Sequence, residues 1–241
     1  MIKYDRDKAI KAFESSKYKE LGEIISYAEP DNLSSKELVQ LIAFKALVEQ
    51  KLHRLYWSKE VSQLAVLALE KADIGERRYL EARLLLNEAQ IIIRNKKDDN
   101  RFESALYLLS LADECFTQLE GYELERLFVK DEKLRITFEL SRNDDGGVEK
   151  IKQIVEEYTI LDGQFDKFTS KTAKTWQLNA GFHSLRVIAY AGYPYVRILG
   201  REVAEKFSSR GNKLKALAAR IYTLGRVGFY INEALARIRG E

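Results

Sequence analysis

Apolar residues recur three and four positions apart along almost the whole chain, and this period constrains the fold more than any other feature. No long stretch alternates apolar and polar side chains, and no Asn-Gly or Asp-Gly turn joins two such stretches as in a β-hairpin. A period near 3.6 residues places the apolar side chains on one face of a helix. The sequence therefore predicts an all-α protein.

Turn-forming residues divide the chain into about eleven predicted helices. Glu29-Pro30-Asp31-Asn32 ends one helix, and Ser34 or Ser35 can cap the next because Glu37 follows shortly after. Asp144-Asp145-Gly146-Gly147 is the clearest loop, since paired glycines disfavour a helix and permit a positive φ. The predicted helices span residues 5–16, 18–29, 35–54, 57–72, 75–96, 101–119, 122–142, 147–160, 167–191, 195–208 and 213–239.

Long and short helices alternate from residue 35 onward. The long helices start near residues 35, 75, 122, 167 and 213, so one repeat covers about 40–47 residues, as in stacked helical hairpins. Each shorter helix carries small, aliphatic or aromatic residues at relative positions 0, 4 and 7, which lie on one helical face. The five matches are Leu21-Ile25-Ala28, Ala65-Leu69-Ala72, Ala105-Leu109-Ala112, Ile151-Val155-Tyr158 and Gly200-Ala204-Phe207.

In these residues the chain resembles the tetratricopeptide-like (TPR-like) helical-repeat superfamily. The second helix of that repeat carries an Ala, an aromatic or aliphatic residue and another Ala at the spacing of Ala65-Leu69-Ala72 and Ala105-Leu109-Ala112. Leu224-Gly225 is similar to the Leu-Gly of the family's first helix. The resemblance implies a right-handed α-solenoid of stacked helical hairpins whose concave inner face binds a peptide or protein.

The composition favours one domain in a reducing compartment. Hydrophobic residues make up 46% of the chain, and no Pro-, Gly- or Ser-rich linker interrupts it, so we predict a single helical-repeat domain over residues 1–241. The charged start Met1–Lys8 lacks the apolar core of a secretory signal, and no stretch approaches the roughly 20 apolar residues of a membrane span. Cys115 is the only cysteine and has no partner for an internal disulfide. We therefore expect a cytoplasmic protein without a membrane partner.

Polar residues form narrow stripes on the long helices. An inner helix of stacked hairpins is apolar nearly all round, so a polar stripe on it marks the face that stays exposed in the groove. Arg and Asn can bind carboxylates or a peptide backbone, and Tyr adds an apolar face with a polar tip. The predicted partner is another protein, in the form of a peptide or helix that could be acidic. The predicted binding residues are Arg83, Asn87, Gln90, Arg94, Arg126, Lys130, Lys133, Asn179, His183, Arg186, Tyr190, Arg226 and Tyr230.

Motifs for catalysis or cofactor binding are missing from the sequence. It has no phosphate-binding glycine loop, no dinucleotide fingerprint and no His-Glu-x-x-His, and a lone cysteine cannot build a zinc–thiolate cluster. Cys115 lies on an apolar helical face, where it acts as a small hydrophobe, and His53 follows Lys51-Leu52 at a helix end. We therefore predict a non-catalytic scaffold with no catalytic residue, metal ligand or cofactor.

An uneven charge distribution supports an alternative function. Residues 166–241 contain 14 Lys and Arg against 5 Asp and Glu, whereas residues 1–165 contain 26 against 32. Basic side chains interspersed with aromatic ones can neutralise phosphates and stack on bases, so nucleic-acid binding through residues 166–241 is the main alternative. Two further possibilities stay open: a helical enzyme without a known motif, and a homo-oligomer formed through Gly225, Gly228, Phe229 and Ile231.

Overall fold

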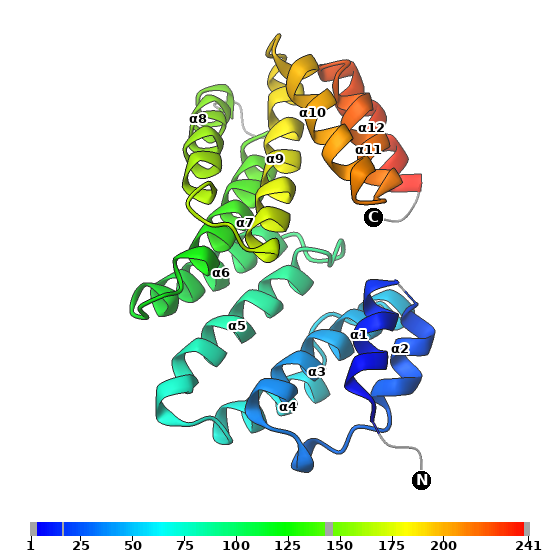
Figure 1. Ribbon diagram of the computed structural model, residues 1–241, viewed down its shortest axis with the longest axis vertical. Helices are drawn as coiled ribbons and strands as arrows, with labels where there is room; N and C mark the ends of the chain where they lie inside the picture. Colours follow the sequence, from blue (N-terminus) through cyan, green and yellow to red (C-terminus); the bar gives the residue numbers. More distant parts are fainter. Residues whose placement is uncertain (1–3, 16, 143–146, 239–241) are drawn as a thin grey trace. The chain divides into compact units, whose positions relative to one another are not determined.

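The computed structural model describes residues 4–15, 17–142 and 147–238. This part of the chain forms twelve α-helices that pack mainly against their neighbours in sequence, which confirms the all-α prediction (Figure 1). Among the described helices, none combines the length and the apolarity that a membrane-spanning segment requires.

The chain divides into two compact units, unit 1 over residues 1–123 and unit 2 over residues 124–241. Each unit has hydrophobic clusters of its own. The single domain over residues 1–241 stays a prediction.

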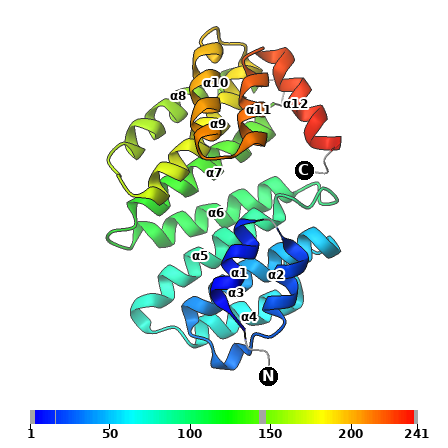
Figure 2. The same ribbon diagram turned by 45° about the vertical axis from the view of Figure 1, so that its right-hand side comes forward.

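Unit 1 consists of three pairs of sequential helices. α1 packs on α2, α3 on α4 and α5 on α6, and α3 also contacts α5 (Figure 2). Leu38, Ile42, Val61 and Leu80 are fully buried between these helices. The helices are α1 (Arg6–Glu14), α2 (Tyr18–Ile25), α3 (Ser35–Val48), α4 (Lys59–Glu70), α5 (Ile74–Ile92) and α6 (Arg101–Thr117).

Both ends of α3 are defined by local interactions. At its start Ser34 and Glu37 form a capping box, in which each side chain accepts a hydrogen bond from the other residue's backbone N–H, as predicted. The helix was expected to continue to residue 54, but from Glu49 to His53 it widens into a π-helical turn. Arg54 then adopts a left-handed conformation with φ of 57°, which ends the helix.

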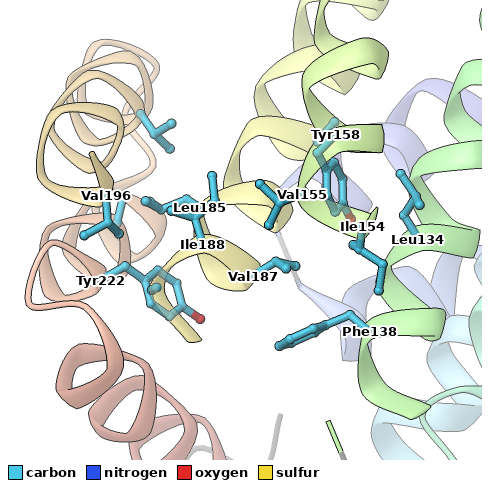
Figure 3. Close-up of a cluster of buried hydrophobic side chains, with 14 of the residues drawn as sticks. Leu134, Phe138, Ile154, Val155, Tyr158, Leu185, Val187, Ile188, Val196 and Tyr222 are labelled. Atoms are coloured by element: carbon cyan, nitrogen blue, oxygen red, sulfur yellow. The ribbon is translucent and has the colours of Figure 1, made fainter. Parts of the chain in front are cut away.

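Unit 2 is built around its longest helix, α9. Side chains of α7 and α8 such as Phe138 and Val155 lie on one side of α9, and Val196 and Tyr222 lie on the other (Figure 3). The helices are α7 (Glu123–Ser141), α8 (Gly147–Phe165), α9 (Lys171–Ala191), α10 (Val196–Ser209), α11 (Lys213–Tyr222) and α12 (Arg226–Ile238).

The predicted repeat faces differ in how deeply they are buried. Ala105-Leu109-Ala112, Ile151-Val155-Tyr158 and Gly200-Ala204-Phe207 are buried throughout. Leu21-Ile25-Ala28 is buried only at Leu21, and Ala65-Leu69-Ala72 is half-buried because α4 buries Val61 and Ala68 instead. Three of the five faces therefore form helix contacts as expected.

The prediction of one helix over residues 213–239 is wrong. The chain leaves the helix after Tyr222 and begins α12 at Arg226. Gly225 lies between them with φ of 64°, a conformation that only glycine adopts at little cost. The break allows α12 to fold back against α11 and α9. A second difference is that α8 extends to Phe165, because Leu161 and Phe165 continue its buried face. The predicted Asp144-Asp145-Gly146 turn lies outside the described residues.

Candidate functional site

The polar stripe of α9 makes hydrogen bonds within unit 2 along its whole length. Asn179 accepts a hydrogen bond from Lys215 Nζ at 2.7 Å, and His183 Nδ1 lies 3.0 Å from both carboxylate oxygens of Asp131. Arg186 donates to the carboxylates of two glutamates, and the Tyr190 hydroxyl donates to the backbone oxygen of Arg142 at 3.3 Å. The structure thus brings these four predicted residues together and uses them to join α9 to its neighbours.

Two arginines and two glutamates form a closed charge ring across α7, α9 and α12. Arg186 donates to Glu139 and, from Nη2, to Glu233 at 2.8 Å. Arg142 donates to Glu233 at 3.1 Å and pairs with Glu139 at 2.9 Å, so each charge has two partners of opposite sign. The four side chains are only 11–24% exposed. The ring is therefore largely buried. Solvent and salt screen ion pairs in such a position less than at an exposed surface.

The ring shifts the pKa values of Arg186 and Glu233. Burial by itself lowers the pKa of Arg186, but Glu139 and Glu233 outweigh it, so the pKa lies above its ordinary value. Burial alone would raise the pKa of Glu233, yet Arg186 and Arg142 hold it below its ordinary value. Burial raises the pKa of the nearby Tyr222 hydroxyl to about 12. Both shifts favour the charged forms of Arg186 and Glu233 at neutral pH.

Sequence reasoning missed the acidic side of this network. Asp131, Glu132 and Glu139 of α7 are buried, although their helix was expected to expose a basic stripe. One signal was present: Asp131, Arg135, Glu139 and Arg142 follow at offsets 0, 4, 8 and 11, which is one helical face with alternating charge.

A cleft of about 270 Å³ opens in unit 2 between α7, α8, α9 and the start of α12. Arg142, Lys152 and Arg226 line it, and no Asp or Glu is among its described lining residues. Its other walls are largely apolar, from Ile151, the exposed Val148 and two tyrosines. The cleft therefore combines positive charge with apolar surface.

Arg226 is held in a fixed orientation at the edge of this cleft. Its Nε donates to the backbone oxygen of Tyr190 at 2.9 Å, and its guanidinium lies 5.6 Å from the centre of the Tyr190 ring. This is the one hydrogen bond that the described residues provide for its guanidinium. An oriented guanidinium with free N–H groups suits the two oxygens of a carboxylate.

The remaining predicted residues of unit 2 are more scattered. On α7, Arg126 is exposed, Lys133 is half-buried, and Lys130 pairs with Glu157 of α8 at 3.1 Å. Tyr230 of α12 is 58% exposed, and its ring lies 5.4 Å from that of Phe229. None of these four is among the described residues that line the cleft.

In unit 1 the predicted stripe lies along α5. Arg83, Asn87 and Gln90 are half-buried, and Arg94 is exposed and donates to Gln50 at 2.9 Å. Their role as a shared face with the residues of unit 2 stays a prediction.

The two residues considered for chemistry have ordinary surroundings. Cys115 is buried, as predicted, and burial raises the pKa of its thiol, which disfavours the reactive thiolate. His53 lies exposed in the π-helical turn after α3. The described residues contain no group of three or more His, Cys, Asp or Glu side chains that could hold a metal ion.

Basic residues of the C-terminal third gather at one end of unit 2. Arg210 donates to Thr175 and to the backbone oxygen of Lys174, so the end of α10 lies beside the start of α9. Lys206 lies close enough to Asp166 to lower its pKa, although Gln177 contributes most to that shift. This basic end comprises Lys167, Lys171, Lys174, Lys206, Arg210 and Lys213. Of the aromatic residues that accompany the basic ones, Tyr195 and Tyr230 are exposed, whereas Tyr222 is buried.

Comparison with known proteins adds no further constraint. No protein-family model matches the chain, and no curated protein or solved structure is significantly similar to it.

Proposed function

We propose that this protein is a non-catalytic interaction scaffold of TPR-like helical hairpins that binds an acidic segment of a partner protein. The observation that carries the proposal is the cleft of unit 2, in which the oriented guanidinium of Arg226 lies beside Arg142, Lys152 and two tyrosines. A volume of about 270 Å³ suits one or two side chains of a peptide.

The cleft is matched to a carboxylate next to an apolar residue. Arg226 supplies a bidentate donor, and Lys152 adds a positive charge; its ion-pair partner Glu149 is exposed. Ile151 and Tyr193 offer apolar surface for the neighbouring side chain. Tyr190 and Arg226, both predicted binding residues, meet here. His183 joins α9 to α7 through Asp131, and Arg186 joins α9 to α12 through Glu233.

Support for a solenoid of stacked hairpins comes from contacts between the first helices of successive pairs. α3 contacts α5 in unit 1, and α9 contacts α11 in unit 2. The ion pair of Arg186 with Glu139 and the hydrogen bond of His183 with Asp131 join α9 to α7. Stacked hairpins make such contacts between neighbouring repeats.

The proposal is tested with a fluorescently labelled peptide that contains Asp and Glu next to Phe or Leu. We expect Arg226→Gln to weaken its binding roughly tenfold, since hydrogen bonds between charged groups contribute about 1.5–3 kcal/mol. Arg220→Gln is the matched control, because Arg220 is exposed on α11 and does not line the cleft. Equal binding by the two variants, or equal binding of a peptide with Asn and Gln in place of the acids, would refute the proposal.

The basic end supports a second candidate function, nucleic-acid binding. Six cationic side chains come from the α8–α9 connection, α9, α10 and α11; of these, Lys174 lies 3.6 Å from Asp166 and Lys206 lies close enough to lower the pKa of Asp166. Such a surface binds phosphates with an affinity that falls steeply as salt rises. Binding of single-stranded nucleic acid that is lost in a Lys206→Gln, Arg210→Gln variant but kept in Arg226→Gln would favour this function over peptide binding.

A further inference from the structure

Unit 1 contains a larger cleft that the proposed function does not use. It has a volume of about 660 Å³, within the range of small-molecule and side-chain binding sites, and lies between α2, α3, the π-helical turn and α4. Its apolar wall comes from Ile25, Leu41, Val48, Leu64 and Leu67.

A pair of glutamates and one lysine form a charged cluster in the lining of this cleft. Lys45 Nζ lies 2.6 Å from Glu60 Oε2 and 3.9 Å from Glu49 Oε1. The other carboxylate oxygen of Glu49, Oε2, is buried and has no hydrogen-bond partner among the described residues, and the side chain as a whole is 13% exposed. A buried carboxylate oxygen without a donor is costly, so this position favours a donor brought by a ligand.

The charge of the cleft also favours a cation. Its described lining residues include three acidic ones, Asp31, Glu49 and Glu60, against one lysine, Lys45, and no arginine. Lys45 is already paired with Glu60, so the excess negative charge lies toward Glu49 and Asp31. A ligand with one positive charge would reduce it.

Several contacts hold the walls of the cleft in place. Lys71 Nζ donates to the backbone oxygens of Pro30, Asp31 and Leu33 at 3.1, 2.6 and 3.0 Å, which fixes the segment before α3 against α4. On the opposite side Gly22 lies so close to α3 that a Cβ there would be 3.2 Å from Val48 Cγ1. The site is thus formed in the chain alone, which keeps the cost of ordering it upon binding low.

We propose that this cleft binds a primary amine or guanidinium carried on a short apolar stem, with Glu49 as its charge partner. The stem lies against Leu64 and Leu67, and the cationic end donates to Glu49 Oε2. A free alkylamine and the side chain of a Lys or Arg in a peptide share this chemistry, and the probes below distinguish the two sources.

The experiment measures binding to the full chain by two-dimensional NMR, with hexylamine, agmatine and hexanol as small probes. A peptide with one Lys between apolar residues, and the same peptide with acetylated Lys, represent the second source. We expect the cationic probes to bind and hexanol and the acetylated peptide to bind roughly tenfold more weakly. If the small amines bind and the peptide does not, the natural ligand is a free amine; if the peptide binds more tightly, it is a side chain.

Two variants with matched controls assign the binding to this cleft. Glu49→Gln removes the charge and should weaken hexylamine binding roughly tenfold, whereas Glu70→Gln, at an exposed position outside the cleft, should leave it unchanged. Gln63→Trp at the exposed cleft edge should block binding, and Val66→Trp on the same helix outside the cleft should not. Unchanged hexylamine binding in both Glu49→Gln and Gln63→Trp, equal binding of hexanol, or no binding of any cationic probe would overturn the proposal.

Discussion

Replacing Arg186 by Met should destabilise unit 2 by about 3 kcal/mol, because the change removes one member of a buried charge ring and leaves its partners in place. Arg186 makes three hydrogen bonds to Glu139 and Glu233, whose side chains are only 11% and 20% exposed. Removing one partner of a buried ion pair costs about 3–5 kcal/mol. We expect the lower end of this range, since Arg142 still pairs with both glutamates.

The substitution isolates the charge from the packing. The methylene groups of Arg186 lie near the rings of Phe138 and Phe229, with the guanidinium carbon 5.4 and 5.6 Å from their centres, and Met fills much of that space. For a unit of this size, 1 kcal/mol corresponds to roughly 4 °C in Tm, so the expected decrease is about 12 °C.

Urea unfolding followed by tryptophan fluorescence checks this prediction. The chain has one tryptophan in each unit, so a Trp57→Phe background leaves Trp176 as the reporter of unit 2. Trp176 is half-buried and its ring lies 4.7 Å from that of Phe128. Urea is preferred to guanidinium chloride because a salt would screen the ion pairs.

Two further variants make the result specific. Arg220→Met, at an exposed position, should change the free energy of unfolding by less than about 0.5 kcal/mol. Adding Glu139→Gln to Arg186→Met should recover part of the loss, because the unpaired buried carboxylate is then neutral. A loss below about 1 kcal/mol in Arg186→Met would refute the view that the ring holds α7, α9 and α12 together.

Three other changes test separate parts of the structure. The pKa of Glu233 is lowered in the folded state from its ordinary 4.5, so its contribution to stability is present above about pH 4.5 and is lost as the pH falls below it. The free energy of unfolding, measured between about pH 3 and 6, should therefore depend less on pH in Glu233→Gln than in the unchanged protein. An equal pH dependence in the two proteins would contradict the lowered pKa. Gly225→Ala should cost about 1 kcal/mol in urea unfolding, since φ is 64° there, and a neutral effect would mean that the turn readjusts. Lys71→Met should cost about 2 kcal/mol through the loss of three hydrogen bonds to backbone oxygens and should speed amide hydrogen exchange in residues 31–34. Lys59→Met is an exposed control that should leave both unchanged.

The helices of this protein were predictable from sequence because their signals are local. The capping box of Ser34 and Glu37 and the buried face Ala105-Leu109-Ala112 each depend on residues within two turns of one another. The break at Gly225 was missed, since a lone glycine is also tolerated inside a helix and Leu224 continues the apolar period. Only the contacts of α12 with α9 and α11 decide between the two conformations.

The proposed binding surface was harder to predict, because a polar stripe does not reveal which neighbouring helix it faces. His183 and Arg186 have the spacing of an exposed stripe, yet they face Asp131 and Glu139, which lie about 50 residues earlier in the chain. The cleft residue Lys152 lies in the second turn of α8, Tyr193 lies in the turn between α9 and α10, and neither belongs to a predicted stripe. They come together only when α8 packs against α9, a long-range contact that periodicity cannot predict.

The most direct test of the proposed function is the affinity of the Arg226→Gln protein for the labelled acidic peptide, measured beside Arg220→Gln at the same salt concentration. Both changes remove one exposed positive charge, so they alter the net charge of unit 2 equally. The proposed site predicts binding roughly tenfold weaker in Arg226→Gln and unchanged in Arg220→Gln. An equal loss in both variants would mean that general electrostatic attraction, and not the cleft, binds the peptide.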